Sequence, residues 1–121
     1  MKVGLAVAAA DALPSAFVVF RDDLCRCVDR CAALGYDGVE LALRYAGEVD
    51  VPEMKRRLAA TGLEVPCISS GQVFAADRLY FTHPDEAVRE AAGWRACLVA
   101  ASVHRRRLGY AAGAAECGGF G

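Results

Sequence analysis

The chain has 121 residues, of which 55% are hydrophobic and 24% are charged, a composition typical of one globular domain rather than of a disordered segment. Its 14 basic and 15 acidic residues leave a formal net charge of -1, so no strong electrostatic field favours nucleic acid or an anionic membrane. No uncharged stretch reaches the ~18 apolar residues of a membrane-spanning helix. We therefore expect a protein that binds neither nucleic acid nor membranes.

The six cysteines do not predict a zinc or redox site, because no two of them have the C-x-x-C spacing. We interpret them as reduced thiols of a cytoplasmic protein. Cys27 and Cys31 share the apolar side of a predicted helix and Cys67 falls in an apolar strand, which favours core positions for all three. The apolar run 3–10 is followed by Asp11 rather than by a cleavage pattern, so it predicts a first strand and not a signal peptide.

Strands and helices alternate along the first three quarters of the chain. Short apolar runs predict strands over 2–8, 38–43 and 64–69, and apolar residues at helical spacing predict helices over 22–34 and 50–62. Gly35 and Gly62 are expected to end these helices, and Asp50 is expected to cap the second. A further helix is predicted to begin at 83–86. The order is that of successive βα units in a parallel sheet.

The composition changes near Gly93, since 14 of the 15 acidic residues precede this point. Residues 94–121 show no clear periodicity, and only Leu108–Ala112 is a candidate for a short strand. We therefore divide the chain into 1–93, which is patterned, and 94–121, a divergent tail. One hypothesis is a shifted reading frame, and the alternative is an authentic short protein with a poorly ordered C-terminus.

Three phrases of the sequence resemble a known family, and they occur in the right order relative to the predicted strands. They are Gly35-Tyr36-Asp37-Gly38-Val39-Glu40-Leu41, then Gly62-Leu63-Glu64-Val65-Pro66, then Ile68-Ser69-Ser70-Gly71-Gln72. Residues 1–93 thereby resemble the N-terminal part of the xylose isomerase-like TIM barrels. This family includes the sugar phosphate isomerase/epimerase proteins of carbohydrate metabolism.

The resemblance implies an α/β fold that comprises the first three βα units of a (β/α)8 TIM barrel, incomplete and followed by an unpatterned tail. A complete barrel has about eight units and ~250 residues. In the family a divalent metal such as Mn, Mg or Zn is held by Glu, Asp, His and Glu side chains from the second half of the barrel. Nothing in this sequence matches those positions, so we expect no metal site in this chain. The implied activity is isomerisation or epimerisation of a sugar or polyol by the full-length parent, with this chain truncated and inactive alone.

Four residues are candidates for contacting such a substrate. Glu40 is expected near the carboxyl end of the second strand, although a solvated or capping carboxylate is the simpler alternative. Gln72 offers hydrogen bonds to sugar hydroxyls, but a Ser-Ser-Gly-Gln sequence is more often an ordinary turn. Phe17 and Phe20 lie in the connection after the first strand, where they are expected either to wall a sugar site or to pack on the first helix.

The remaining polar motifs favour structural roles. His83 and His104 have no second ligand or carboxylate at a diagnostic spacing, which favours a cap or surface position. The run Arg105–Arg107 lacks interleaved aromatic residues and is interpreted as a solvated tail. The catalytic residues are therefore unknown. A non-catalytic α/β module that associates with itself or with another chain through open sheet edges is the alternative function.

Overall fold

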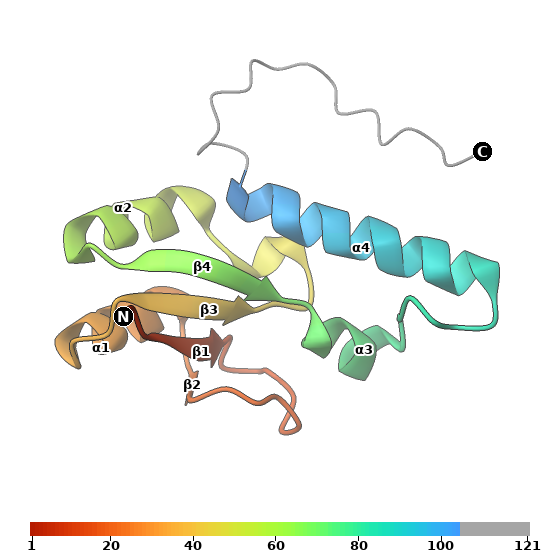
Figure 1. Ribbon diagram of the computed structural model, residues 1–121, viewed down its shortest axis with the longest axis horizontal. Helices are drawn as coiled ribbons and strands as arrows, with labels where there is room; N and C mark the ends of the chain where they lie inside the picture. Colours follow the sequence, from red (N-terminus) through yellow and green to blue (C-terminus); the bar gives the residue numbers. More distant parts are fainter. Residues whose placement is uncertain (105–121) are drawn as a thin grey trace, which may run out of the picture.

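The computed structural model describes the backbone of residues 1–104 and the side chains of residues 1–99. Four parallel strands form one sheet in the order β2-β1-β3-β4, namely β1 (Gly4–Ala8), β2 (Phe20–Arg21), β3 (Gly38–Ala42) and β4 (Glu64–Ser69). The helices are α1 (Leu24–Ala33), α2 (Val51–Thr61), α3 (Gly71–Asp77) and α4 (Glu86–His104), and η1 (Ala46–Glu48) is a 3-10 turn (Figure 1). The predicted α/β class is confirmed.

Local capping signals set the ends of the first two helices. Asp23 and Asp50 each accept a hydrogen bond from the backbone N–H three residues further on, at 3.1 and 3.0 Å, which satisfies one otherwise unpaired donor at the helix start. Gly35 and Gly62 have φ values of 81° and 73°, a left-handed conformation that glycine adopts without steric cost. The predicted stops at these glycines and the predicted cap at Asp50 are confirmed.

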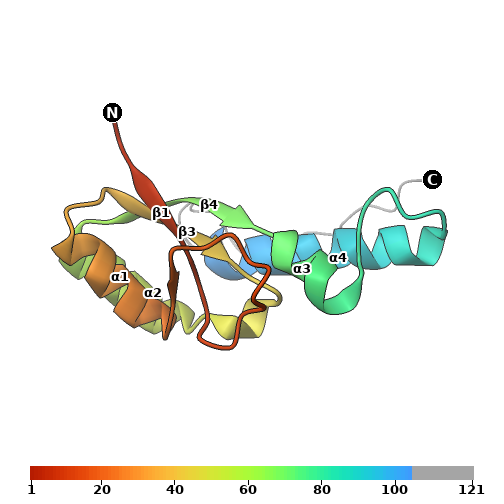
Figure 2. The ribbon, with the colours of Figure 1, turned by 90° about the horizontal axis from the view of Figure 1, so that it is seen from below.

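Helices α1 and α2 cover the same face of the sheet (Figure 2). The alternation of side chains along β1 and β3 sends their large apolar residues to this face. Together they form one buried cluster: Val7, Leu24, Cys27, Val28, Cys31, Val39, Leu41, Leu43, Val49, Met54, Leu63 and Val99. The core positions predicted for Cys27 and Cys31 are confirmed, and burial raises the pKa of the Cys27 thiol from 9.0 to about 11.

The opposite face carries smaller and more polar side chains. Glu40 of β3 pairs in register with Ala6 of β1 on one side and with Cys67 of β4 on the other. Glu40 points away from α1 and α2, because its strand neighbours Val39 and Leu41 belong to the core beneath these helices. Ala6 and Cys67 lie on the same face as Glu40 because they are paired with it in register. The prediction that Cys67 is a core residue is wrong: the side chain is exposed, because its place in the alternation of β4 puts it on the face that neither helix covers.

Two elements were not expected from the sequence. The connection after β1 contains β2, which pairs with the end of β1 through Val7 and Phe20. Residues expected to form only a turn after β4 begin α3. Helix α4 continues through Gly93 to His104, while the candidate strand Leu108–Ala112 lies outside the described residues. Among the described helices none is both long and apolar enough to cross a membrane.

Candidate functional site

Polar side chains gather where the parallel strands end. Asp11 follows β1, Arg44 follows β3, and Gln72 lies in the first turn of α3, directly after β4. Helix α3 lies beyond the arrowheads of β3 and β4 (Figure 1). The carboxyl edge of a parallel sheet is where such folds bind ligands. This edge is therefore the candidate site.

Arg44 connects two of the loops at this edge. Its Nη2 donates to Asp11 Oδ1 at 2.7 Å, and its Nε donates to Glu48 Oε1 at 2.6 Å. The Arg44 backbone N–H donates to the other oxygen of Glu48 at 2.5 Å. The Arg44 and Glu48 side chains are only 12% and 5% exposed, so their charges are shielded from water and depend on each other.

These contacts change the pKa values of Asp11 and Arg44. The hydrogen bond from Arg44 lowers the pKa of Asp11 below its ordinary value of 3.8. The same hydrogen bond, together with that to Glu48, raises the pKa of Arg44. Asp11 therefore stays ionised and Arg44 stays protonated at neutral pH. These groups hold the loops in place, and they are poorly suited to exchange protons with a substrate.

Helix α4 is tied to the same network through Arg95. Its Nη1 donates to the carbonyl oxygen of Arg44 at 3.1 Å and to Asp77 Oδ2 at 2.6 Å. Asp77 is the last residue of α3. The loops after β1 and β3, the end of α3 and helix α4 are thus joined at one edge of the sheet by two arginines.

Gln72 is the exception among the polar groups of this edge. Its side chain is buried, with 4% of the residue exposed. Neither Nε2 nor Oε1 has a hydrogen-bond partner among the described residues. Buried side-chain amides are almost always hydrogen-bonded, so each such case needs an explanation. The sequence analysis gave Gln72 as a candidate substrate contact or as part of an ordinary turn, and the structure places it in the first turn of α3 with its side chain buried.

Glu40 does not lie at the carboxyl edge, as the sequence suggested. It is the central residue of β3 and is half-buried on the face away from α1 and α2. Its neighbours in register, Ala6 and Cys67, are small. Glu40 therefore lies in the middle of this face of the sheet and not at its carboxyl edge.

Phe17 and Phe20, the two candidate phenylalanines after β1, differ in exposure and packing. Phe17 is fully exposed and walls no site. Phe20 lies in β2, packs against the core cluster and carries the Arg30 guanidinium 4.1 Å from its ring centre. The alternative interpretation, packing against α1, is thus the correct one for Phe20.

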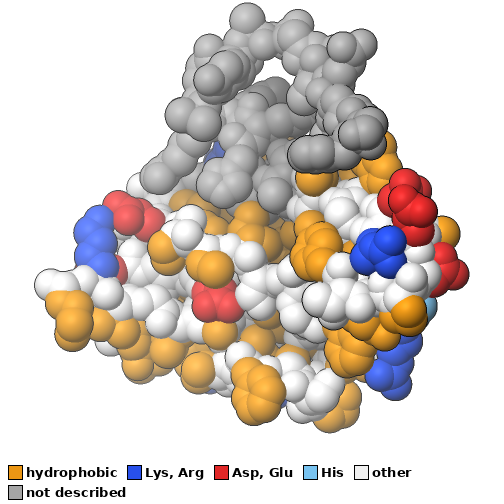
Figure 3. All heavy atoms as spheres, turned by 45° about the vertical axis from the view of Figure 1, so that its right-hand side comes forward, with side chains coloured by type: hydrophobic (Ala, Val, Ile, Leu, Met, Phe, Trp, Pro, Cys, Tyr) orange, Lys and Arg blue, Asp and Glu red, His pale blue; other side chains and the backbone are white. Residues whose placement is uncertain are grey.

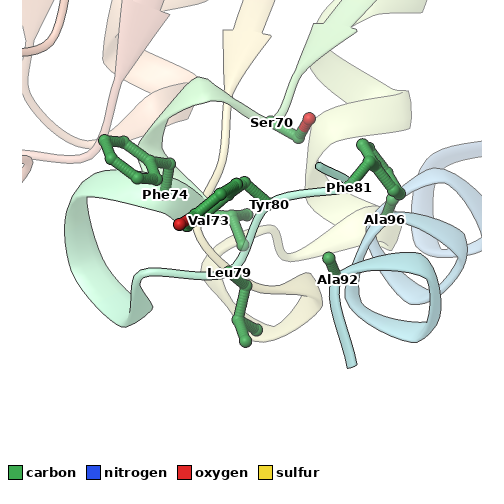
Figure 4. Close-up of a pocket in the computed structure, with 8 residues that line it drawn as sticks. All are labelled: Ser70, Val73, Phe74, Leu79, Tyr80, Phe81, Ala92 and Ala96. Carbon is green, nitrogen blue, oxygen red and sulfur yellow. The ribbon is translucent and has the colours of Figure 1, made fainter. Parts of the chain in front are cut away.

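A small hollow lies beside the edge, between α3, the segment after it and α4 (Figure 4). Its volume is about 180 Å³, and it is lined by Ser70, Val73, Phe74, Leu79, Tyr80, Phe81, Ala92 and Ala96. Phe74 and Phe81 remain 46% and 61% exposed, and the space-filling view shows hydrophobic side chains reaching the surface on this side of the molecule (Figure 3). Apolar walls dominate this hollow.

The histidines show no catalytic arrangement within the described residues. His83 Nδ1 accepts a hydrogen bond from the Asp85 backbone N–H at 3.0 Å, and its ring meets Tyr80 edge-on at 4.9 Å. These contacts fit the predicted capping role ahead of α4. The His104 side chain and Arg105–Arg107 lie outside the described part of the chain.

The described residues do not fit the metal site of the resembled family. Across residues 1–99 no group of three or more His, Cys, Asp or Glu side chains converges on one point. A divalent metal in a protein is normally held by at least three such ligands. We therefore derive no chemical step through a metal for this chain.

The sequence interpretation missed the residues that organise the edge. Arg44, Glu48 and Asp11 form the best-connected polar cluster of the site, and none was a candidate. The sequence did contain one signal for these residues: a charged residue that closely follows a predicted buried strand falls at the carboxyl edge of the sheet. Their pairing depends on two loops 33 residues apart in sequence, which no local pattern reveals.

Comparison of the chain with models of protein families and with curated proteins finds no match. The fold and the chemistry of its carboxyl edge therefore carry the functional argument.

Proposed function

We propose that this chain supplies the first three βα units of a sugar or polyol isomerase/epimerase of the xylose isomerase-like type. The observation that carries the proposal is the winding of the sheet. Strands β1, β3 and β4 lie next to one another in chain order, and both connecting helices cover the same face (Figure 2).

This winding distinguishes two ways of building a parallel sheet. In a doubly wound fold the strand order reverses and helices cover both faces. In a barrel each strand of a βα unit is added beside the previous one, the helices stay outside, and the other face becomes the interior. Strands β1, β3 and β4 follow this pattern, whereas β2, which has two residues and no helix between it and β1, lies on the outer side of β1. The face with Ala6, Glu40 and Cys67 corresponds to that interior, where small side chains leave room for the opposite wall.

The part assigned to the chain is substrate positioning at the carboxyl edge. Isomerisation of a sugar moves a proton between neighbouring carbons, which requires an acid or base free to exchange protons. The acidic and basic side chains at this edge are paired, since Arg44 binds both Asp11 and Glu48. The proton-transfer groups would therefore come from the remaining units, and the chain alone is expected to be inactive.

The test begins with the coding DNA, read in all three frames from the codon for Asp85 onward. We expect one frame to continue with βα units that carry Glu, Asp and His at strand ends. The protein read in that frame should interconvert aldoses and ketoses with added Mn²⁺ and should lose this activity with a chelator. If no frame continues the pattern, the isomerase proposal is wrong.

A second candidate function is supported by the open edge of the sheet. Strand β4 has six residues and no partner strand on its outer side among the described elements. Such an edge favours pairing with another chain, although Pro66 removes one backbone donor from β4. In this case the chain is a non-catalytic module that completes its sheet by association.

Static light scattering on the purified chain, combined with thermal unfolding, separates the two candidates. A stable dimer that melts cooperatively, with a transition that rises with protein concentration, supports the module. A monodisperse monomer at all concentrations rules out a module that completes its sheet with a second copy of this chain.

A further inference from the structure

The hollow between α3, the segment after it and α4 has the size and the walls of a site for a single ring. Its volume is about 180 Å³, and an apolar cavity of about 150 Å³ is large enough to hold benzene. The hollow is partly open, so a ligand can enter it from the surface. None of the residues that line it carries a charge, so the body of a ligand held there must be apolar.

Aromatic rings on one side and small residues on the other shape this hollow. Phe74, Tyr80 and Phe81 contribute the rings (Figure 4), and the first two meet edge-on with their centres 5.4 Å apart. Ala92 and Ala96 lie one turn apart on α4, and their short side chains leave the space unfilled. Aromatic rings gain from edge-to-face and offset contacts with a further ring. The walls therefore favour a flat aromatic ligand.

Arg78 ends α3 in a backbone conformation that arginine rarely adopts. Its φ and ψ are 57° and 25°, in the left-handed region, where any residue with a Cβ atom pays a steric cost that glycine avoids. No other described residue except glycine has a positive φ. Strained positions of this kind concentrate at ligand sites, which indicates a use for the arginine side chain.

The guanidinium of Arg78 lies beside the hollow. Its Cζ is 5.4 Å from the centre of the Phe74 ring, and the same ring lines the hollow. Among the described residues no carboxylate pairs with this guanidinium. The nearest acidic residue in sequence, Asp77, binds Nη1 of Arg95 at 2.6 Å instead. A positive charge without an anion therefore stands next to an apolar hollow.

We propose that the hollow binds a small aromatic carboxylate, with its ring between the aromatic side chains and the alanines of α4 and its carboxylate accepting hydrogen bonds from Arg78. A guanidinium matches a carboxylate in geometry and charge, and this pairing would fix the orientation of the ring. A sugar lacks both the apolar body and the negative charge. Such binding is independent of the isomerase activity proposed above.

Titration of the full 121-residue chain with benzoate, followed by ¹H–¹⁵N correlation spectra, tests the site. Benzyl alcohol keeps the ring without the charge, and acetate keeps the charge without the ring. We expect saturable shifts of backbone signals from residues 70–81 and 92–96 with benzoate, binding of benzyl alcohol that is about fivefold weaker, and no saturable shift with acetate. If benzoate gives no saturable shift of these signals, the proposal is wrong.

Arg78→Gly tests the charged contact without endangering the fold. Glycine adopts the left-handed conformation freely, so the variant should melt at a temperature at least as high as the wild type. Its affinity for benzoate should fall about fivefold, to that of benzyl alcohol, and its affinity for benzyl alcohol should not change. Unchanged binding of benzoate would overturn the role of Arg78.

A second pair of variants tests the location. Ala96→Leu places a larger side chain in the hollow and should abolish binding of both benzoate and benzyl alcohol. Ala91→Leu, on an exposed position of the same helix outside the lining, is the matched control and should bind benzoate as the wild type does. Binding that survives Ala96→Leu, or that is lost equally in Ala91→Leu, would overturn the assignment to this hollow.

Discussion

Gly38 at the start of β3 allows this strand to lie close to the start of β4. A Cβ atom at this position would lie 2.8 Å from the Glu64 carbonyl oxygen and 3.2 Å from Cδ of Pro66. The β3–β4 register is irregular at this point, between Gly38 and Glu40. We predict that Gly38→Ala forces β3 and β4 apart and destabilises the protein.

The magnitude follows from the size of the overlap. Ordinary Cβ contacts begin near 3.4 Å, so the strands must separate locally by about 0.6 Å. The neighbour is backbone, which cannot rotate away as a side chain can. Overpacking of this kind costs about 1–3 kcal/mol, and the lower entropy of alanine in the unfolded chain offsets about 0.4–1 kcal/mol of it. The net loss should be about 1–2 kcal/mol.

Urea unfolding followed by circular dichroism measures this loss directly, and the melting temperature should fall by about 5–10 °C. Gly93→Ala is the matched control, because Gly93 lies within α4 and a Cβ there meets nothing within 4 Å. It should stabilise the protein by about 0.5–1 kcal/mol. A Gly38→Ala protein more stable than the wild type would refute the packing argument, because the entropic term would then act alone.

Three further predictions concern charge, the β1–β2 connection and pH. Arg44→Met leaves the buried Glu48 carboxylate without its partner and should cost at least about 2 kcal/mol, whereas Arg26→Met, which breaks an exposed pair, should cost less than about 1 kcal/mol in the same urea assay. Phe20→Ala should destabilise by about 2 kcal/mol because Phe20 packs on the core, while Phe17→Ser should change stability by less than about 0.5 kcal/mol because Phe17 is exposed; equal effects would contradict the assignment. Burial raises the pKa of Cys27 from 9.0 to about 11, so between these pH values the folded state retains a proton that the unfolded state loses. The free energy of unfolding should therefore fall as pH rises from 9.0 to about 11. Cys27→Ala should reduce this slope, and an unchanged slope would count against the role of Cys27.

The elements with strong local signals could be predicted from the sequence. Helix α2 is the clearest case, because the cap at Asp50 and the stop at Gly62 are both properties of a few neighbouring residues. Strand β4 was predicted with the bounds observed. By contrast, β2 has two residues and exists only because it pairs with β1, so no local pattern distinguishes it from a loop.

The candidate site shows the same contrast between features set by neighbouring residues and features set by tertiary contacts. Gln72 was recognisable as a polar residue after a strand, and the resemblance to a sugar isomerase family suggested hydroxyl groups as partners of its amide. That it is buried and unpaired depends on how α3 and its neighbours enclose it. Glu40 was expected near the carboxyl end of the predicted strand 38–43, yet it is the central residue of β3, which runs from Gly38 to Ala42.

The sequence by itself determined the class of the protein, the first two helices with their ends, and the apolar residues that face them, because helix capping and hydrophobic periodicity act over a few residues. Only the tertiary structure decided which polar groups meet. Arg44 pairs with Asp11 across 33 residues of sequence, and Cys67 is exposed on the face that α1 and α2 leave uncovered. Gln72 is buried without a hydrogen-bond partner among the described residues. Such contacts arise from the packing of distant segments, where burial and pairing depend on the whole fold rather than on adjacent residues.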